Sequence, residues 1–160
     1  GLWSTARDFR HLDGAVLGPF EAWLLLRSMR TMYLRARQSC KSAMRIAEHF
    51  ALHEKVDRVA YPGLPDHPGH AIAARQMSGG FGGLLSIFVK GGAEATLTVA
   101  KSVKLFIPAT SLGGVESLIE HRVTVEGSES PVPDDLLRIG VGIEDTDDLI
   151  ADLEQVLEDL

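Results

Sequence analysis

Two short stretches of this chain combine polar side chains with features of a buried strand. In residues 109–121, Ser111 supplies a hydroxyl group just before Gly113 and Gly114, and an apolar run follows. Paired glycines allow backbone turns that a Cβ atom would forbid, and they let another group approach closely. In residues 136–145, Arg138 is the lone arginine of a strand-like apolar run. We therefore expect a polar wall in which the two stretches are partners.

Three other patterns fit binding chemistry less well. His67 and His70 could ligate a metal, but Pro68 breaks the helix that would align their rings, and no third ligand is nearby. The glycines of residues 79–83 lack the lysine and hydroxyl residue of a phosphate-binding loop. Cys40 lies within an apolar stripe, which favours a structural thiol over a nucleophile. We expect no metal site.

Composition limits the classes of function. The chain has 160 residues, enough for one core with an appendage, and its net charge of −6 argues against a general nucleic-acid binder. A single cysteine excludes an internal disulfide and fits a reducing compartment such as the cytoplasm. No apolar run approaches the roughly 18 residues that would span a membrane. The chain begins with Gly1, shows no signal-peptide pattern and resembles the middle of a longer sequence.

Helical and strand-like patterns follow one another along the chain. Gly18-Pro19 with Glu21 predicts the start of a long helix over about residues 20–52. The first 17 residues are weakly patterned, and 124–135 reads as a loop. The remaining elements are expected strands at 56–61, 84–90 and 136–141, and expected helices at 71–77, 93–102 and 149–160. These elements predict an α+β fold, a small, mainly antiparallel sheet with helices packed on one side, preceded by the long helix.

The long helix also carries a basic face. Four cations lie opposite its apolar stripe, namely Arg30, Arg37, Lys41 and Arg45. Such a face could bind nucleic acid or an anionic membrane. Because the rest of the chain is acidic, a solvated or subunit-facing surface is the favoured interpretation, with no nucleic acid and no membrane as partner.

The two polar stretches, 111–118 and 137–145, resemble the C-terminal part of the Cys/Met-metabolism family, pyridoxal-phosphate enzymes of fold type I. The family includes cystathionine γ-synthase, cystathionine γ- and β-lyase and methionine γ-lyase. The likeness covers nearly the whole chain in order, and further matching segments are 18–27, 61–64, 67–68, 75–77, 81–83 and 148–153.

The resemblance implies roles for three residues. Arg138 occupies the position of the family's arginine that pairs with the substrate α-carboxylate, and a planar guanidinium suits that contact. Ser111 would lie beside the carboxylate. Thr110 precedes it at a position that helps set reaction specificity, where many cystathionine-handling members carry Glu. A second departure is the segment 122–135, which is shorter than usual and lacks the family's Met-Thr-His sequence.

The family's cofactor residues have no counterpart here. None of the five lysines lies in the Ser-x-Thr-Lys context of the Schiff-base lysine. We therefore expect residues 1–33 to be a remnant of the cofactor domain with a linker helix, and residues 34–160 to be the C-terminal substrate-side domain. The chain would be a cytoplasmic fragment, inactive alone, of a homo-oligomeric enzyme that acts on sulfur amino acids or homoserine esters by β/γ-elimination or γ-replacement.

An alternative from another class is a standalone, non-catalytic module. It would bind an amino acid or form an oligomer, with the basic helix face as a contact. A Ser-x-Thr-Lys segment encoded upstream of Gly1 would favour the enzyme, and an initiator Met close to Gly1 would favour the module.

The missing lysine context generates a first prediction. Mixing this chain with pyridoxal phosphate should give no stable imine absorbance, because electron-sink chemistry requires a positioned lysine and partners for the cofactor ring. Borohydride reduction followed by peptide mass spectrometry would reveal any trapped adduct. A stable adduct at one specific lysine would contradict the expectation.

Overall fold

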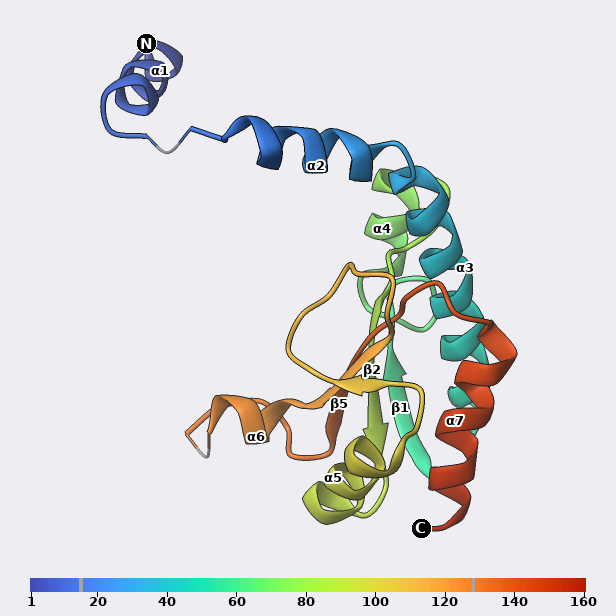
Figure 1. The fold of residues 1–160 in the computed structure, drawn as a ribbon. Coiled ribbons are helices and arrows are strands. Elements are labelled where there is room, and N and C mark those ends of the chain that lie inside the picture. Colours follow the sequence, from blue (N-terminus) through green and yellow to red (C-terminus); the bar gives the residue numbers. More distant parts are fainter. Residues whose placement is uncertain (15, 128) are drawn as a thin grey trace. The chain divides into compact units, whose positions relative to one another are not determined.

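The computed structural model describes residues 1–14, 16–127 and 129–160. These residues form seven helices and five strands (Figure 1). They divide into two compact units, residues 1–33 and residues 34–160, and each unit is described by itself.

The first unit is helical. Helix α1 spans Leu2–Leu12, a stretch for which the sequence pattern predicted no element, and α2 spans Pro19–Met29. Pro19 occupies the first turn of α2 and Glu21 places a carboxylate there, as the sequence suggested. Neither helix has a buried residue.

The prediction of one continuous helix over residues 20–52 was wrong. Helix α2 ends at Met29, and α3 begins at Met32 and continues to Phe50. Around the break each backbone hydrogen bond spans three residues instead of the four of an α-helix. Arg30 N–H donates to Arg27 O at 3.3 Å, and Thr31 N–H donates to Ser28 O at 3.4 Å. This tightened turn ends the first helix without a proline.

The second unit is built on one mixed sheet. Its strands are β1 (Val56–Ala60), β2 (Leu84–Val89), β3 (Ile107–Pro108), β4 (Leu118–His121) and β5 (Leu136–Gly140). Their order is β1-β2-β5-β4-β3, and only the last pair, β4 and β3, is parallel among the described residues. The prediction of a small, mainly antiparallel sheet is confirmed.

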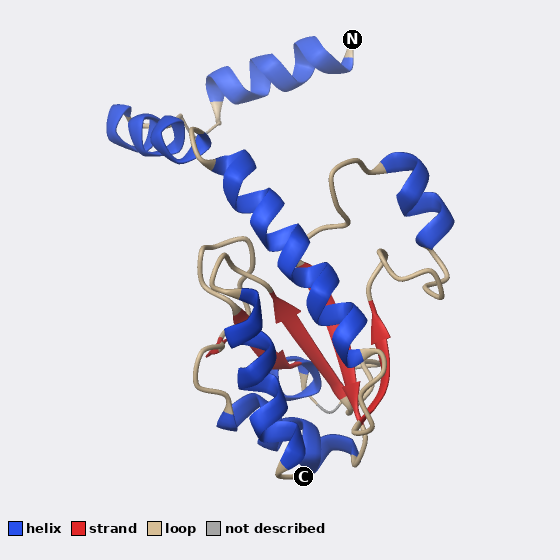
Figure 2. Ribbon diagram, turned by 90° about the vertical axis from the view of Figure 1, so that its right-hand side faces the viewer, coloured by secondary structure: helices blue, strands red, loops and turns tan. Residues whose placement is uncertain are grey.

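One face of the sheet holds the core. Apolar side chains of β2, β4 and β5 pack with α3, α5 (Gly92–Ser102) and α7 (Thr146–Glu158), and α3 runs along the sheet in Figure 2. The largest fully buried side chains here include Phe50, Ile87, Ile139 and Leu153. The opposite face carries a row of three residues in register, Ser86, Arg138 and Glu120. Helices thus cover one side of the sheet and leave the polar row on the other.

Two short helices lie in connecting segments. Helix α4 spans His70–Gln76, close to its predicted place. Helix α6 spans Arg122–Glu126, where the sequence analysis expected a loop from residue 124; Ser128 of that loop lies outside the described residues. Its five residues are held by ion pairs between Arg122 and the carboxylates of Glu120 and Glu126.

The edge strand β3 is fixed from two sides. Ile107 N–H donates to Ser117 O at 2.9 Å and Ala109 N–H to Ile119 O at 3.2 Å, so both bond toward β4. Pro108 lies between them. On the approach to β3, the buried carboxylate of Asp152 on α7 accepts the backbone N–H groups of residues 104, 105 and 106 at 2.8, 2.8 and 3.2 Å.

A segment that we call the strap, residues 109–117, leads from β3 to β4 and is clamped to the end of β5. The carboxylate of Glu144 accepts both the N–H of Ser117, at 2.6 Å, and its hydroxyl, at 2.8 Å. That hydroxyl also accepts Gly142 N–H at 2.9 Å, and Ile143 N–H donates to Val115 O at 3.0 Å. The clamp fixes the strap over β5, with Leu112 beside Gly140.

The clamp predicts an effect of Gly142→Ala. A Cβ atom at Gly142 would lie 2.2 Å from Val115 O and 2.6 Å from the Glu116 carbonyl carbon, so the strap backbone would have to shift. We expect a loss of about 1–3 kcal/mol in the free energy of unfolding, measured by urea denaturation. Gly140→Ala is the matched control, because its Cβ would meet nothing closer than 3.6 Å. Equal stabilities of the two variants would contradict the clamp.

Tyr61 generates a pH prediction. Its side chain is fully buried, its hydroxyl donates to Gly82 O at 2.8 Å, and burial raises its pKa to about 12, with a smaller contribution from Cys40. An unfolded tyrosine releases its proton near pH 10. The contribution of Tyr61 to the free energy of unfolding should therefore be constant below pH 10 and fall as the pH rises toward 12, by about 1 kcal/mol at pH 11.

The measurement is urea denaturation at pH 8 and pH 11 for the unaltered chain and for Tyr61→Phe. Other groups titrate in both proteins, so the difference between their slopes isolates Tyr61. Identical pH dependence of the two proteins would show that Tyr61 ionises normally in the folded chain.

Candidate functional site

The guanidinium of Arg138 is the centre of the polar row. Its Nη2 donates to the carbonyl oxygen of Thr110 and, at 3.3 Å, to that of Ser111. Its Nε forms an ion pair with Glu120 Oε1 at 2.6 Å. Among the described residues its remaining nitrogen, Nη1, has no partner. The structure thus brings the three residues singled out by sequence, Arg138, Thr110 and Ser111, to one place.

Thr110 and Ser111 meet Arg138 through their backbones. Both residues are exposed, and the contacts to Nη2 come from their carbonyl oxygens. The sequence suggested the hydroxyl of Ser111 as the interacting group. Among the described residues that hydroxyl has no hydrogen-bond partner, while the strap backbone helps to fix the direction of the guanidinium.

Glu120 is a site residue that the sequence analysis missed. It lies on β4 directly opposite Arg138 of β5, and its side chain is 4% exposed. Its Oε1 also accepts Arg122 Nη1 at 2.9 Å. The other oxygen, Oε2, is buried without a partner among the described residues. In the sequence, a carboxylate within an apolar strand was the only sign of this residue. Its pairing with Arg138 could not be predicted, because it depends on the register of β4 and β5.

A chain of alternating charges continues from Glu120. Arg122 also pairs with Glu126, and Ser130 donates its hydroxyl to Glu126 Oε2 at 2.5 Å. The hydrogen bond from Ser130 lowers the pKa of Glu126, and the nearby Arg122 and Arg138 lower it further. The hydrogen bond to Glu120 raises the pKa of Arg122. These shifts favour the charged forms of Arg122 and Glu126, and the four side chains follow one another in the order Arg138, Glu120, Arg122, Glu126.

A cavity of about 270 Å³ lies beside these groups. Its lining includes the polar residues Thr110, Glu120, His121 and Thr124, and Lys101 on α5 is the one lysine or arginine in its described lining. The remaining walls are mostly apolar, from residues such as Leu97, Ile119 and Val125. Arg138 itself is not among the described residues that line this cavity.

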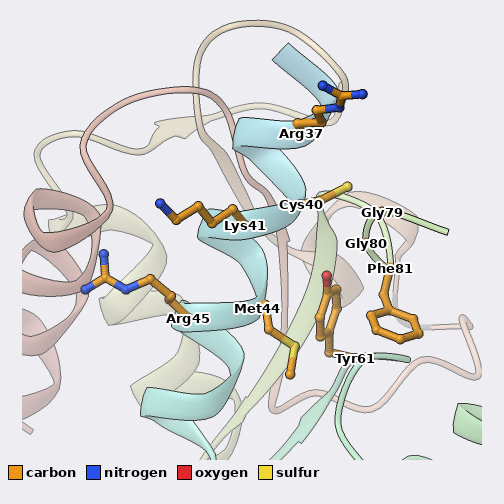
Figure 3. A pocket seen from close by; sticks show the side chains of 9 residues that line it. All are labelled: Arg37, Cys40, Lys41, Met44, Arg45, Tyr61, Gly79, Gly80 and Phe81. Carbon is orange, nitrogen blue, oxygen red and sulfur yellow. The ribbon is translucent and has the colours of Figure 1, made fainter. Parts of the chain in front are cut away.

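A larger cavity, of about 370 Å³, lies between α3 and the glycine-rich segment at residues 79–81 (Figure 3). Its polar groups do not converge. Lys41 and Arg45 extend to one side of α3, whereas Met44, Tyr61 and Phe81 lie on the other. Arg45 pairs with Asp147, and the hydroxyl of Tyr61 is bonded to Gly82 O. The polar row around Arg138 is therefore the stronger candidate site.

The histidines singled out by sequence have local partners. His67 Nδ1 accepts Gly69 N–H at 3.0 Å, and His70 Nδ1 lies 2.8 Å from Pro62 O. No group of three potential metal ligands occurs among the described residues. Within the same residues, no helix is long and apolar enough to cross a membrane.

Comparison with known proteins places this geometry in context. A model of the family described as Cys/Met metabolism PLP-dependent enzymes matches residues 2–158. Cystathionine gamma-synthase of Mycobacterium tuberculosis is 50% identical over 149 residues, which cover 90% of this chain and 38% of that protein. L-methionine gamma-lyase of Fusobacterium nucleatum is 42% identical, covering 93% of this chain and 40% of the relative.

A solved structure agrees in fold. The crystal structure of cystathionine gamma-lyase from yeast superimposes with a TM-score of 0.89 at 41% identity, covering 98% of this chain and 42% of that one. The chain spans about two fifths of the length of the curated relatives it matches. The α+β prediction is confirmed, and the match over residues 2–158 shows that this chain belongs to the family of Cys/Met metabolism PLP-dependent enzymes.

Proposed function

We propose that this chain forms the substrate-carboxylate wall of a pyridoxal-phosphate enzyme of the trans-sulfuration type. The substrates would be sulfur amino acids or homoserine esters, and the reaction a β/γ-elimination or γ-replacement. The chain alone would be inactive. The observation that carries the proposal is the setting of Arg138, whose guanidinium is held on two of its nitrogens and, within the described part of the chain, has no partner on the third.

The open edge of Arg138 suits an α-carboxylate. A carboxylate can meet a guanidinium at its Nε edge or at its outer Nη1/Nη2 edge. Glu120 occupies Nε, so the outer edge is the one left for a ligand. The 3.3 Å contact from Nη2 to Ser111 O is the weaker of its two carbonyl contacts, and an incoming carboxylate oxygen would replace it while Nη1 takes the other oxygen.

Three lysines of this chain, Lys90, Lys101 and Lys104, do not fit the cofactor itself. Lys90 and Lys104 are bonded to Glu54 O and Gln155. Lys101 borders the cavity beside Thr110, but an imine at its nitrogen would leave a phosphate group without a lysine or arginine in that lining. Pyridoxal phosphate supplies an electron sink to its enzymes. We propose that another part of a longer protein holds it.

The same proposal assigns roles to the two units. Residues 1–33 would be the remnant of the cofactor domain with a linker helix, and residues 34–160 the substrate-side domain. The first unit exposes large apolar side chains, among them Leu17, Phe20, Trp23 and Leu25; Ala15 lies outside the described residues. Such a surface supports further contacts with the rest of an enzyme or with a second copy in a homo-oligomer. The single cysteine supports a cytoplasmic location.

The proposal predicts the effect of Arg138→Lys in the longest natural protein that contains this segment. A lysine keeps the charge but loses the planar pair of donors. Loss of one charge-assisted hydrogen bond corresponds to a fall of about 10- to 100-fold in kcat/KM for the amino-acid substrate. Steady-state kinetics with O-acyl-homoserine and cystathionine as trial substrates would measure it.

Arg58→Lys is the matched control. Arg58 lies on the same face of the sheet, but its guanidinium stacks on the ring of Phe88 at 3.3 Å from the centroid. Its replacement should leave kcat/KM nearly unchanged. An unchanged kcat/KM in Arg138→Lys would remove Arg138 from the site and, with it, the proposed function.

A further inference from the structure

We propose that Glu120 is a positioning residue, which sets the direction of the Arg138 guanidinium and thereby the affinity for a ligand carboxylate. The inference rests on the proposed function, because it assumes that Arg138 binds a carboxylate. It adds a second residue, acting through the first, and a test that separates the two ideas.

The backbone places Glu120 and Arg138 opposite each other. They are cross-strand partners on the antiparallel pair β4 and β5, and both face away from the apolar core. The Nε–Oε1 distance of 2.6 Å is short for an ion pair, and the carboxylate is 4% exposed. Water therefore screens this contact little, and the register leaves Arg138 few alternative directions.

The contact with Glu120 determines which edge of the Arg138 guanidinium can meet a ligand. A free guanidinium can turn about its last side-chain bonds and present either edge. Nε is bonded to Glu120 and Nη2 to Thr110 O, and these two contacts fix the orientation of the guanidinium plane. Nη1 is the nitrogen left for a ligand. A ligand then binds a group that is already ordered, so less conformational entropy is lost on binding.

Arg122 keeps Glu120 from cancelling the charge of Arg138. Two guanidinium groups share the single oxygen Oε1, which leaves one positive charge in excess over the three groups. Glu126 pairs with Arg122 and not with Arg138, and the two side chains are similarly exposed, at 31% and 28%. The attraction for an anion therefore comes from Arg138 itself, whose partner oxygen is shared with Arg122.

The unpartnered Oε2 atom supports a positioning role. A carboxylate that served only to stabilise the fold would be expected to have both buried oxygens hydrogen-bonded. Here both donors are on Oε1, and Oε2 is buried without one among the described residues. The arrangement favours the orientation of the two arginines over full satisfaction of the carboxylate.

The test uses the longest natural protein that contains this segment, with its cofactor bound, and the variants Glu120→Gln and Glu126→Gln. Two probes are titrated by calorimetry, L-homoserine and 3-aminopropan-1-ol, which is the same molecule without the α-carboxylate. Glu120→Gln should weaken homoserine binding about 10-fold and leave aminopropanol binding unchanged. Glu126→Gln is the control, because Glu126 does not contact Arg138, and it should change homoserine binding by less than about 2-fold.

A double-mutant cycle with Arg138→Lys decides whether Glu120 acts through Arg138. If it does, Glu120→Gln has little further effect on homoserine affinity in the Arg138→Lys background. Equal effects in both backgrounds, or equal weakening of both probes, would overturn the inference while the proposed function stands. If Arg138→Lys leaves homoserine binding unchanged, both are overturned.

Thermal melting of each variant checks that it folds. Where Glu120→Gln does not fold, Glu120→Asp serves, since it keeps the charge but is too short to hold Nε at the same distance. It should weaken homoserine binding and spare aminopropanol binding. Unchanged homoserine affinity in Glu120→Asp would also overturn the inference.

Discussion

This site depends on the two hydrogen bonds that Ser117 donates, from its N–H and its hydroxyl, to the carboxylate of Glu144. They tie the end of the strap to the segment that follows β5, and Gly142 permits the two backbones to approach closely enough for them. The strap in turn carries the carbonyl groups that meet Arg138. A contact made by residues outside the polar row therefore decides where two of its acceptors lie. The glycines and the glutamate of residues 140–144 are best understood as parts of this backbone junction.

Much of the fold could be predicted from the sequence, because the periodicity of apolar residues located three strands and three helices of the second unit within a few residues. It failed at 30–31, where a tightened turn without proline or glycine interrupts a continuous apolar pattern. It also failed at 122–126, because the ion pairs that hold α6 link residues on both sides of its start. Arg138, Ser111 and Thr110 could be named from sequence. Glu120 could not, because its role depends on which residue of β5 lies opposite, and register is a tertiary property.

The contact at Thr110 has a consequence for its side chain. The carbonyl oxygen of Thr110 bonds to Arg138, while its side chain takes no part in that contact. A backbone contact does not depend on the type of residue. The side chain at this position can therefore be exchanged while the carbonyl contact with Arg138 stays the same.

Pro108 occupies the one position of β3 whose N–H would point outward. Its neighbours Ile107 and Ala109 both bond toward β4, so an ordinary residue between them would offer its amide to the surroundings. Proline has no amide hydrogen to offer. An unprotected edge strand is a template for cross-β growth, and natural sheets often close such edges with proline. The edge therefore lacks the one amide hydrogen of this two-residue strand that a further strand would need, which disfavours extension of the sheet at β3.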